Sequence, residues 1–426
     1  SGVSIILDEE IVRHFTNRSI TIYHDLATLF LESWKRMNTS IQHDWDMMEF
    51  EKEELPRPDF YGTDRRISPI TLTWEIYFPS EKRLRKFLIS GTIVTITEIN
   101  IKKLCIVIFT IGVVIVFPKI WANRIKNNTK EENVGIYTSL VTATLSKNLA
   151  LFLTKKENHK TDTNFEDSFI FKSFLFDFFS SYSSLFYILL IKQQYIKRFV
   201  EDAPTGCEYD NCLIELTIQL AILLIGKQAF RQFKDLFVPW AKIKFNKQRL
   251  KMELENLIDK YKNYEKTIPQ WVSDGCLAEA PEIGMSEYGD MVVQFGYIAL
   301  FGPAFPLAAF FSWINNVVEV RTDAFKYIKT SQRPVAFQTQ DIGMWEYVLH
   351  VLSSLGVLTN AIMIAFYSNW VQAQFQKYTG DNDNLLLIAR LGFILVFEHM
   401  VFIVKFIVAY LVPNRSRRLK EAIERE

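Results

Sequence analysis

Two pairs of acidic residues flank a long apolar stretch in the second half of the chain, and they constrain the fold more than any other feature. Glu287 and Asp290 precede the stretch, and Glu319 and Asp323 follow it. Residues three or four positions apart are neighbours on a helix surface, so each pair presents its carboxylates on one helical face. A stretch this long and apolar predicts membrane helices, where carboxylates are rare and usually functional.

Pro303 and Pro306 interrupt the apolar stretch and predict a turn near its middle. A helix rises roughly 18 Å from Asp290 to Gly302 and roughly 20 Å from Pro306 to Glu319. If the chain turns back at the prolines, both acidic pairs reach about the same depth on adjacent helices. Four carboxylates gathered there need a cation, shared protons or water. Oxygen ligands favour a hard ion, and calcium is the expected one.

The composition is that of a membrane protein. Of the 426 residues, 49% are hydrophobic and 35 are Phe, and several apolar stretches reach the length of a membrane helix. The net charge of +1 gives no basis for a nucleic-acid partner. The four Cys show no CxxC spacing, and the six His form no HExxH or Ser-His-Asp pattern. The sequence therefore predicts an all-α polytopic membrane protein that is not an enzyme.

Hydropathy divides the chain into three parts. Residues 1–86 are a cytosolic linker containing the end of an early membrane helix, residues 87–413 form a transmembrane domain, and residues 414–426 are a basic cytosolic tail. About eight spans are predicted, at residues 104–121, 134–153, 169–191, 212–239, 288–303, 306–321, 345–370 and 385–413. Because a polar run at 98–103 precedes the first span, residues 87–97 are expected at the membrane interface.

Basic residues predict the orientation of these spans. Clusters of Lys and Arg follow the 212–239 span, the hairpin and the last span, and an eight-span count places all three on one face. The positive-inside tendency makes that face cytoplasmic. Asp235, four residues before Pro239, then lies near the hairpin acids in the cytoplasmic half of the membrane. Three helices can therefore contribute carboxylates to one site.

Several long segments carry a resemblance to a known family. The first is the hairpin itself, EYGDMVVQFGYIALFGPAFPLAAFFSWINNVVEVRTDAFK. The others follow in order: LESWKR from Leu31, DWDMMEFE from Asp44, RPDFYG from Arg57, ENHKTDTNFEDSFIFKSFLFDFFSSYSSLFYI from Glu157, CLIELTIQLAILLIGKQ from Cys212, DIGMW from Asp341 and IARLGF from Ile388. In these segments the chain resembles the anoctamin family of calcium-activated chloride channels and phospholipid scramblases. The resemblance covers nearly the whole chain.

The resemblance implies a ten-helix subunit, a homodimer and a membrane-exposed groove beside a calcium site. The visible spans would be the third to the tenth, without the family's cytosolic N-terminal domain and first membrane helices. The implied calcium ligands are Asp235, Glu287, Asp290, Glu319 and Asp323. A further ligand falls on Arg231 or Gln232, and Gln232 is the better candidate because a guanidinium is a poor ligand. A second site in some members uses the position of Glu32, but its partner position here is Ala409, so that site is expected to be weak or missing.

A gating mechanism follows from these charges. With the site empty, repulsion among the acids would bend the Asp235 helix away, and Gly226 offers the hinge because glycine tolerates unusual dihedral angles. Calcium would draw the helix in and open the groove. Candidates to line the groove are Lys227 and four hydroxyl residues of the predicted span 169–191. These hydroxyl residues are Ser180, Ser181, Ser183 and Ser184. Helix packing for these Ser residues and snorkelling for Lys227 are the alternatives.

Three functions remain open from the sequence. The first is a calcium-activated phospholipid scramblase with accompanying ion conductance, in which membrane phospholipids and small ions are the partners. The second is a calcium-activated chloride channel, and the third is a non-conducting membrane tether or regulator. The plasma membrane is expected rather than the endoplasmic reticulum.

Overall fold

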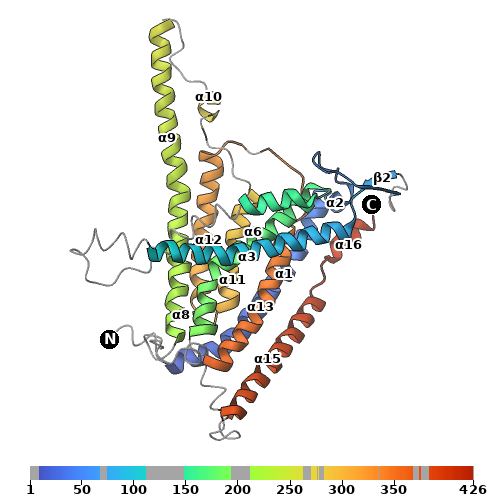
Figure 1. Cartoon of the computed structure of the whole chain (residues 1–426), viewed down its shortest axis with the longest axis vertical. Helices are drawn as coiled ribbons and strands as arrows, with labels where there is room; N and C mark the ends of the chain where they lie inside the picture. Colours follow the sequence, from blue (N-terminus) through green and yellow to red (C-terminus); the bar gives the residue numbers. More distant parts are fainter. Residues whose placement is uncertain are drawn as a thin grey trace, which may run out of the picture. The chain divides into compact units, whose positions relative to one another are not determined.

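The computed structural model describes residues 9–67, 74–111, 148–192, 212–261, 270–275, 277, 283–333, 335–367, 374–375 and 383–425 (Figure 1). Helices make up most of this part, which also contains one two-stranded antiparallel sheet. The predicted all-α class is therefore confirmed. The chain forms two compact units. The first comprises Ser1–His43, Leu185–Gln338 and Leu349–Glu426, and the second comprises Asp44–Ser184 and Thr339–Val348.

The first unit contains the hairpin and the helices around it. Its helical elements are α1 (Glu9–Asp44), η2 (Tyr187–Lys192), α8 (Cys212–Ala221), η3 (Ile222–Lys227), α9 (Gln228–Tyr261), α10 (Gln270–Gly275), α11 (Ile283–Phe301), α12 (Ala308–Phe325), η4 (Lys326–Thr330), most of α13 (Met344–Tyr367), α15 (Asp383–Leu411) and α16 (Arg417–Ile423). The elements η2, η3 and η4 are π-helical turns. Such turns insert an extra residue into a helix and often occur at functional sites.

The second unit carries the sheet and the remaining helices. These are α2 (Phe50–Glu53), β1 (Asp64–Ile67), β2 (Trp74–Tyr77), α3 (Ser80–Ile111), a helix at residues 148–157 and most of α6 (Asp162–Phe186). Helix α3 runs without a break through the polar run at 98–103, so this run does not end a helix. The rest of the predicted span 104–121, beyond residue 111, lies outside the described residues, as does most of the span 134–153.

A buried polar cluster lies inside the second unit. The carboxylate of Glu157, whose side chain is 1% exposed, accepts hydrogen bonds from Ser90, from Ser168 at 2.6 Å and from Lys172 at 2.8 Å, and contacts His159 at 2.9 Å. Burial raises the pKa of Glu157, but the hydrogen bonds from these partners outweigh it and lower the pKa to about 2. Glu157 is thus a buried anion with its partners in place.

The chain turns back at the prolines, as predicted. Helix α11 ends at Phe301, and two short backbone bonds follow, from Ala304 N–H to Phe301 at 3.0 Å and from Phe305 N–H to Gly302 at 3.2 Å. Helix α12 then begins at Ala308. These turns bring the two halves of the apolar stretch together as a helical hairpin.

Helix α13 packs closely against the first arm of this hairpin. A Cβ atom at Gly356 would lie 2.5 Å from the carbonyl oxygen of Ala299, so glycine is needed for the close approach of the two backbones. Thr359 and Asn360 donate hydrogen bonds to the carbonyl oxygens of Leu300 and Ala299, at 2.9 and 3.0 Å. On its other side α13 packs against α15 through Ala361, Ala365 and Ile394.

The segment that carries Gly226 and Asp235 is helical throughout. Helix α8 passes through the π-helical turn η3 into α9, which continues beyond Pro239 to Tyr261. A proline inside a helix costs about 3 kcal/mol. The residues that follow are rich in the helix formers Lys, Glu and Leu, which favour continuation of the helix. The predicted span 212–239 therefore ends within a helix.

Three helical stretches in the described residues have the length and hydropathy to cross a membrane: Leu213–Asn246, Met344–Tyr367 and Asn384–Leu411. They coincide with the predicted spans 212–239, 345–370 and 385–413. The eight-span topology as a whole stays a prediction.

Candidate metal centre

Three of the predicted acids converge at the open end of the hairpin. Glu287 on α11 and Glu319 and Asp323 on α12 each offer a carboxylate oxygen, and these atoms lie within 4.8 Å of one another. Glu319 is buried and the other two are half-buried. The turn after Phe301 makes this possible, because it returns α12 alongside α11 with its acidic face toward Glu287.

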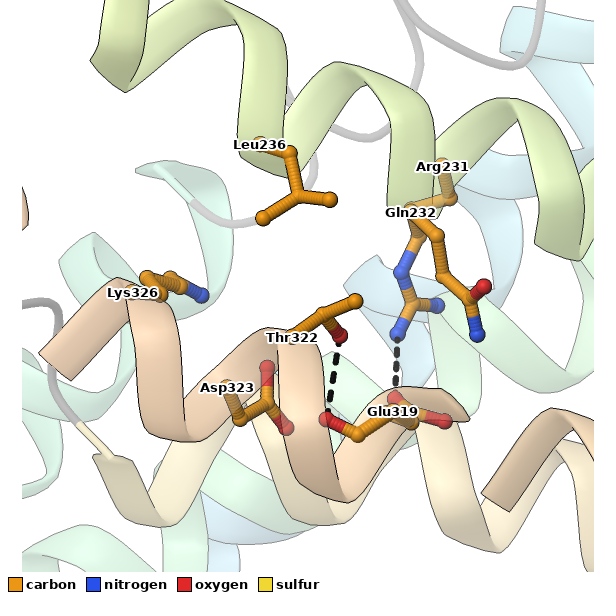
Figure 2. Close-up of a pocket in the computed structure, with 7 residues that line it drawn as sticks. All are labelled: Arg231, Gln232, Leu236, Glu319, Thr322, Asp323 and Lys326. Atoms are coloured by element: carbon orange, nitrogen blue, oxygen red, sulfur yellow. Dashed lines mark hydrogen bonds and ion pairs between the residues drawn. The ribbon is translucent and has the colours of Figure 1, made fainter. Parts of the chain in front are cut away.

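Helix α9 covers this cluster and forms a pocket with it. The lining side chains come from three elements: Arg231, Gln232 and Leu236 on α9, Glu319, Thr322 and Asp323 on α12, and Lys326 on η4. Figure 2 shows Arg231 extending from α9 toward Glu319, with Asp323 on the neighbouring turn of α12. The expected approach of a third helix to the hairpin acids is present.

Two cations of the chain contact the hairpin acids. The guanidinium of Arg231 forms an ion pair with Asp290 and lies 3.6 Å from Glu319 Oε1. The Lys326 ammonium lies 2.7 Å from Glu287 Oε1, which also accepts a hydrogen bond from the Tyr327 hydroxyl at 3.3 Å. Sequence reasoning treated Arg231 only as a poor ligand and missed this role. The available signal was its spacing of one helical turn from Asp235.

A ladder of amide side chains joins α9 to both arms of the hairpin. Gln232 donates to Asn315 Oδ1 at 2.6 Å, and Asn315 donates to Glu319 Oε2 at 3.1 Å and to Gln294 Oε1 at 2.8 Å. One turn away, Gln228 donates to Gln294 at 3.3 Å, and Gln294 donates to Asn316 at 2.8 Å. The ladder leads from the metal centre toward η3, where Gly226 lies.

The other predicted site residues fall in several places. The side chain of Asp235 lies outside the described residues, although its backbone is part of α9. Gln232 lines the pocket but donates its amide to Asn315, so it supports the site from α9. Lys227 is exposed on η3. In α6, Ser180 and Ser184 are exposed, Ser183 is half-buried and Ser181 is buried.

Glu32, which the family resemblance suggests for a second metal site, forms an ion pair within its own helix. Glu32 on α1 is buried and pairs with Lys35 at 3.5 Å, and Ala409 on α15 offers no ligand atom.

The donor chemistry of the hairpin fits a single hard divalent cation. Carboxylate oxygens are the ligands that calcium prefers, and three are close enough to share one ion. The four hairpin acids carry four negative charges, of which Arg231 and Lys326 offset two. A bound divalent ion would offset the charge of two further carboxylates.

Comparison with known proteins agrees with this geometry. The family profile described as "Anoctamin: Calcium-activated chloride channel" matches residues 19–426. Curated relatives include anoctamin-7 of Homo sapiens, at 30% identity over 94% of this chain and 49% of the relative. Anoctamin-3 of Mus musculus is 29% identical, over 94% of this chain and 48% of the relative. The chain thus spans about half the length of these relatives. With nearly all of its sequence matched and its acidic hairpin in place, the chain belongs to the anoctamin family of multi-pass membrane proteins.

Proposed function

We propose that this protein is a calcium-activated phospholipid scramblase with accompanying ion conductance, acting as a homodimer in the plasma membrane. The observation that carries the proposal is the convergence of Glu287, Glu319 and Asp323 beneath α9. This arrangement supports the proposal because a cation bound by these acids would also interact with α9, which covers them. Membership of a family described as calcium-activated supports calcium as the ion.

The protein's own groups provide the two states that gating requires. Glu287, Glu319 and Asp323 would hold the ion, and Asp235 on α9 is proposed to join them. A bound divalent cation would supply the positive charge that lets these carboxylates lie close together. Without that charge, repulsion between the hairpin acids and Asp235 would favour an outward position of α9, against the ion pairs of Arg231. The π-helical turn η3 is where α9 can bend. A ligand that prefers one of two positions of α9 shifts their populations.

The outer surface of α9 supports contact with lipid. Phe230, Phe233, Phe237 and Trp240 are all exposed, by 49 to 62%. A continuous aromatic surface on a helix that meets the criteria for a membrane span is typical of a lipid-facing surface. The exposed hydroxyls of Ser180 and Ser184 on α6 are proposed to hydrogen-bond phospholipid headgroups as they cross.

A chloride channel is the second candidate, and the family description favours it. Exposed Lys227 would attract anions in either case. The two candidates differ in whether lipid moves together with the ions. A non-conducting tether is the third, and the offset of two acidic charges by Arg231 and Lys326 favours it, because it reduces the demand for calcium.

Reconstituted liposomes test these functions directly. The purified protein is placed in vesicles containing fluorescent phospholipid and a chloride-sensitive dye, and calcium is then added. Accessibility of the inner-leaflet label together with ion flux supports the scramblase. Chloride flux without lipid movement would replace it by the channel, and the absence of both in a folded protein would leave the tether.

A further inference from the structure

Arg231 occupies an unusual position for a residue of a metal centre. It extends from α9, the helix that must move, and contacts acids on both arms of the hairpin, Asp290 on α11 and Glu319 on α12. Figure 2 shows it reaching across the pocket from above α12. Its guanidinium brings a positive charge and several N–H donors to the carboxylates.

We propose that Arg231 is a tethered cation of the carboxylate cluster. It holds α9 against the hairpin without a metal ion, and it opposes the binding of a divalent cation there. This inference rests on the proposed calcium site and specifies its regulation. In effect, the chain supplies part of the positive charge that the ion would otherwise bring.

The charges of the cluster determine whether Arg231 raises or lowers the affinity for a divalent ion. Asp290 is paired with Arg231, so it is less available to a divalent ion, and the guanidinium also lies near Glu319, the most buried carboxylate of the candidate site. Two like charges a few ångströms apart in a partly buried pocket repel one another strongly. Removal of the guanidinium should therefore increase the affinity for calcium.

Other contacts keep α9 in place when Arg231 is changed. Gln232 still donates to Asn315 at 2.6 Å, and Gln228 still donates to Gln294 at 3.3 Å. The pocket is therefore not expected to collapse when the ion pair is lost. Without Arg231, α9 is attracted less strongly to the hairpin acids when no metal is bound. This weaker attraction can be measured separately from calcium binding.

The test compares the wild-type chain with Arg231→Gln, Arg231→Lys and Lys234→Gln in lipid nanodiscs. Lys234 is the matched control, because it is an exposed cation on the same helix that does not line the pocket. Calcium binding is measured by isothermal titration calorimetry. The stability of α9 is measured as hydrogen exchange of the amides of residues 228–236 in EGTA.

Arg231→Gln should bind calcium at least about tenfold more tightly than the wild type, because the repulsion is gone. In EGTA its α9 amides should exchange faster, and calcium should restore their protection. Arg231→Lys should bind calcium within about threefold of the wild type, and Lys234→Gln should match the wild type in both measurements.

A purely structural role for Arg231 would weaken calcium binding when it is lost. Unchanged or weaker calcium binding in Arg231→Gln, or unchanged exchange in EGTA, would overturn the proposal. Absence of calcium binding in both the wild type and Arg231→Gln would contradict the calcium site instead. In that case faster exchange of Arg231→Gln in EGTA would still demonstrate the tether.

Discussion

Glu319 and Asp290 occupy different electrostatic positions in the same cluster. Glu319 is buried and belongs to the group of three carboxylates that can share an ion, whereas Asp290 is paired with Arg231. Their sequence positions alone predict equal roles. In the proposed site, Glu319 would therefore contribute more than Asp290 to the binding of a divalent ion.

We therefore expect Glu319→Gln to weaken calcium binding by at least about tenfold, because a buried ligand charge is lost. Asp290→Asn should have a smaller effect, since Asp290 is not among the three carboxylates that lie close enough to share an ion. Terbium luminescence or calorimetry on the purified variants measures both. Glu398→Gln, an acid of α15 that does not line the pocket, is the matched control. Equal losses of calcium affinity in Glu319→Gln and Asp290→Asn would contradict the larger role proposed for Glu319.

Glu157 makes the stability of the second unit dependent on pH. Its pKa is lowered in the folded protein from 4.5 to about 2, so its charge stabilises the fold above pH 4.5 and this contribution is lost as the pH falls toward 2. The full contribution is about 3 kcal/mol at neutral pH.

Glu157→Gln should destabilise the protein by about 3 kcal/mol near pH 7, because Lys172 loses its anionic partner. It should also flatten the dependence of unfolding on pH between about 4.5 and 2. Chemical denaturation in detergent over this pH range provides the measurement. Glu421→Gln, on the exposed end of the chain, should leave the pH profile unchanged. If the stability of Glu157→Gln changed with pH in the same way as that of the wild type, the side chain of Glu157 would not be a buried anion.

At the scale of elements, the continuous helix from α8 to α9 contains the predicted hinge. Gly226 lies inside the π-helical turn η3, one residue before Lys227. An added Cβ there would meet only Ile222 Cγ2, at 4.0 Å, so alanine fits without a clash. The effect of alanine would thus report the stiffness of the helix and not its packing.

Gly226→Ala should lower the calcium concentration required for activation by up to about fivefold. Alanine favours a helix by about 1 kcal/mol over glycine and so disfavours the bent, metal-free position of α9. Calcium titration of lipid scrambling in liposomes measures the shift. Gly392→Ala is a matched control, because Gly392 also lies in a helix with open space around it. A shift to higher calcium in Gly226→Ala would show that activation itself needs the bend.

At the scale of the whole molecule, the topology can be tested independently of function. The eight-span prediction places residues 414–426 in the cytosol and the segment 193–211 outside, because the basic clusters remain on the cytoplasmic side. An epitope in 193–211 should be labelled on intact cells, whereas one at the carboxyl end should require permeabilisation. Labelling of both epitopes on the same side of the membrane would contradict the predicted number of spans between them.

The sequence by itself determined the helical class, the hairpin and the acids on it. Proline positions and helical spacing are local properties, and they place Glu287, Glu319 and Asp323 together regardless of the rest of the chain. The continuation of α9 past Pro239 was not evident, because the hydropathy pattern marks a membrane boundary and not a helix end.

Only the tertiary structure decided which partners these acids have. The ion pairs of Arg231 depend on the rotation and height of α9 against α11 and α12, and side-chain packing over the whole pocket sets both. Lys326 reaches Glu287 because η4 continues α12 by a π-helical turn, which the sequence does not signal. Local spacing therefore assembles the negative charges, whereas the packing of separate helices determines how much of that charge is left for a metal ion.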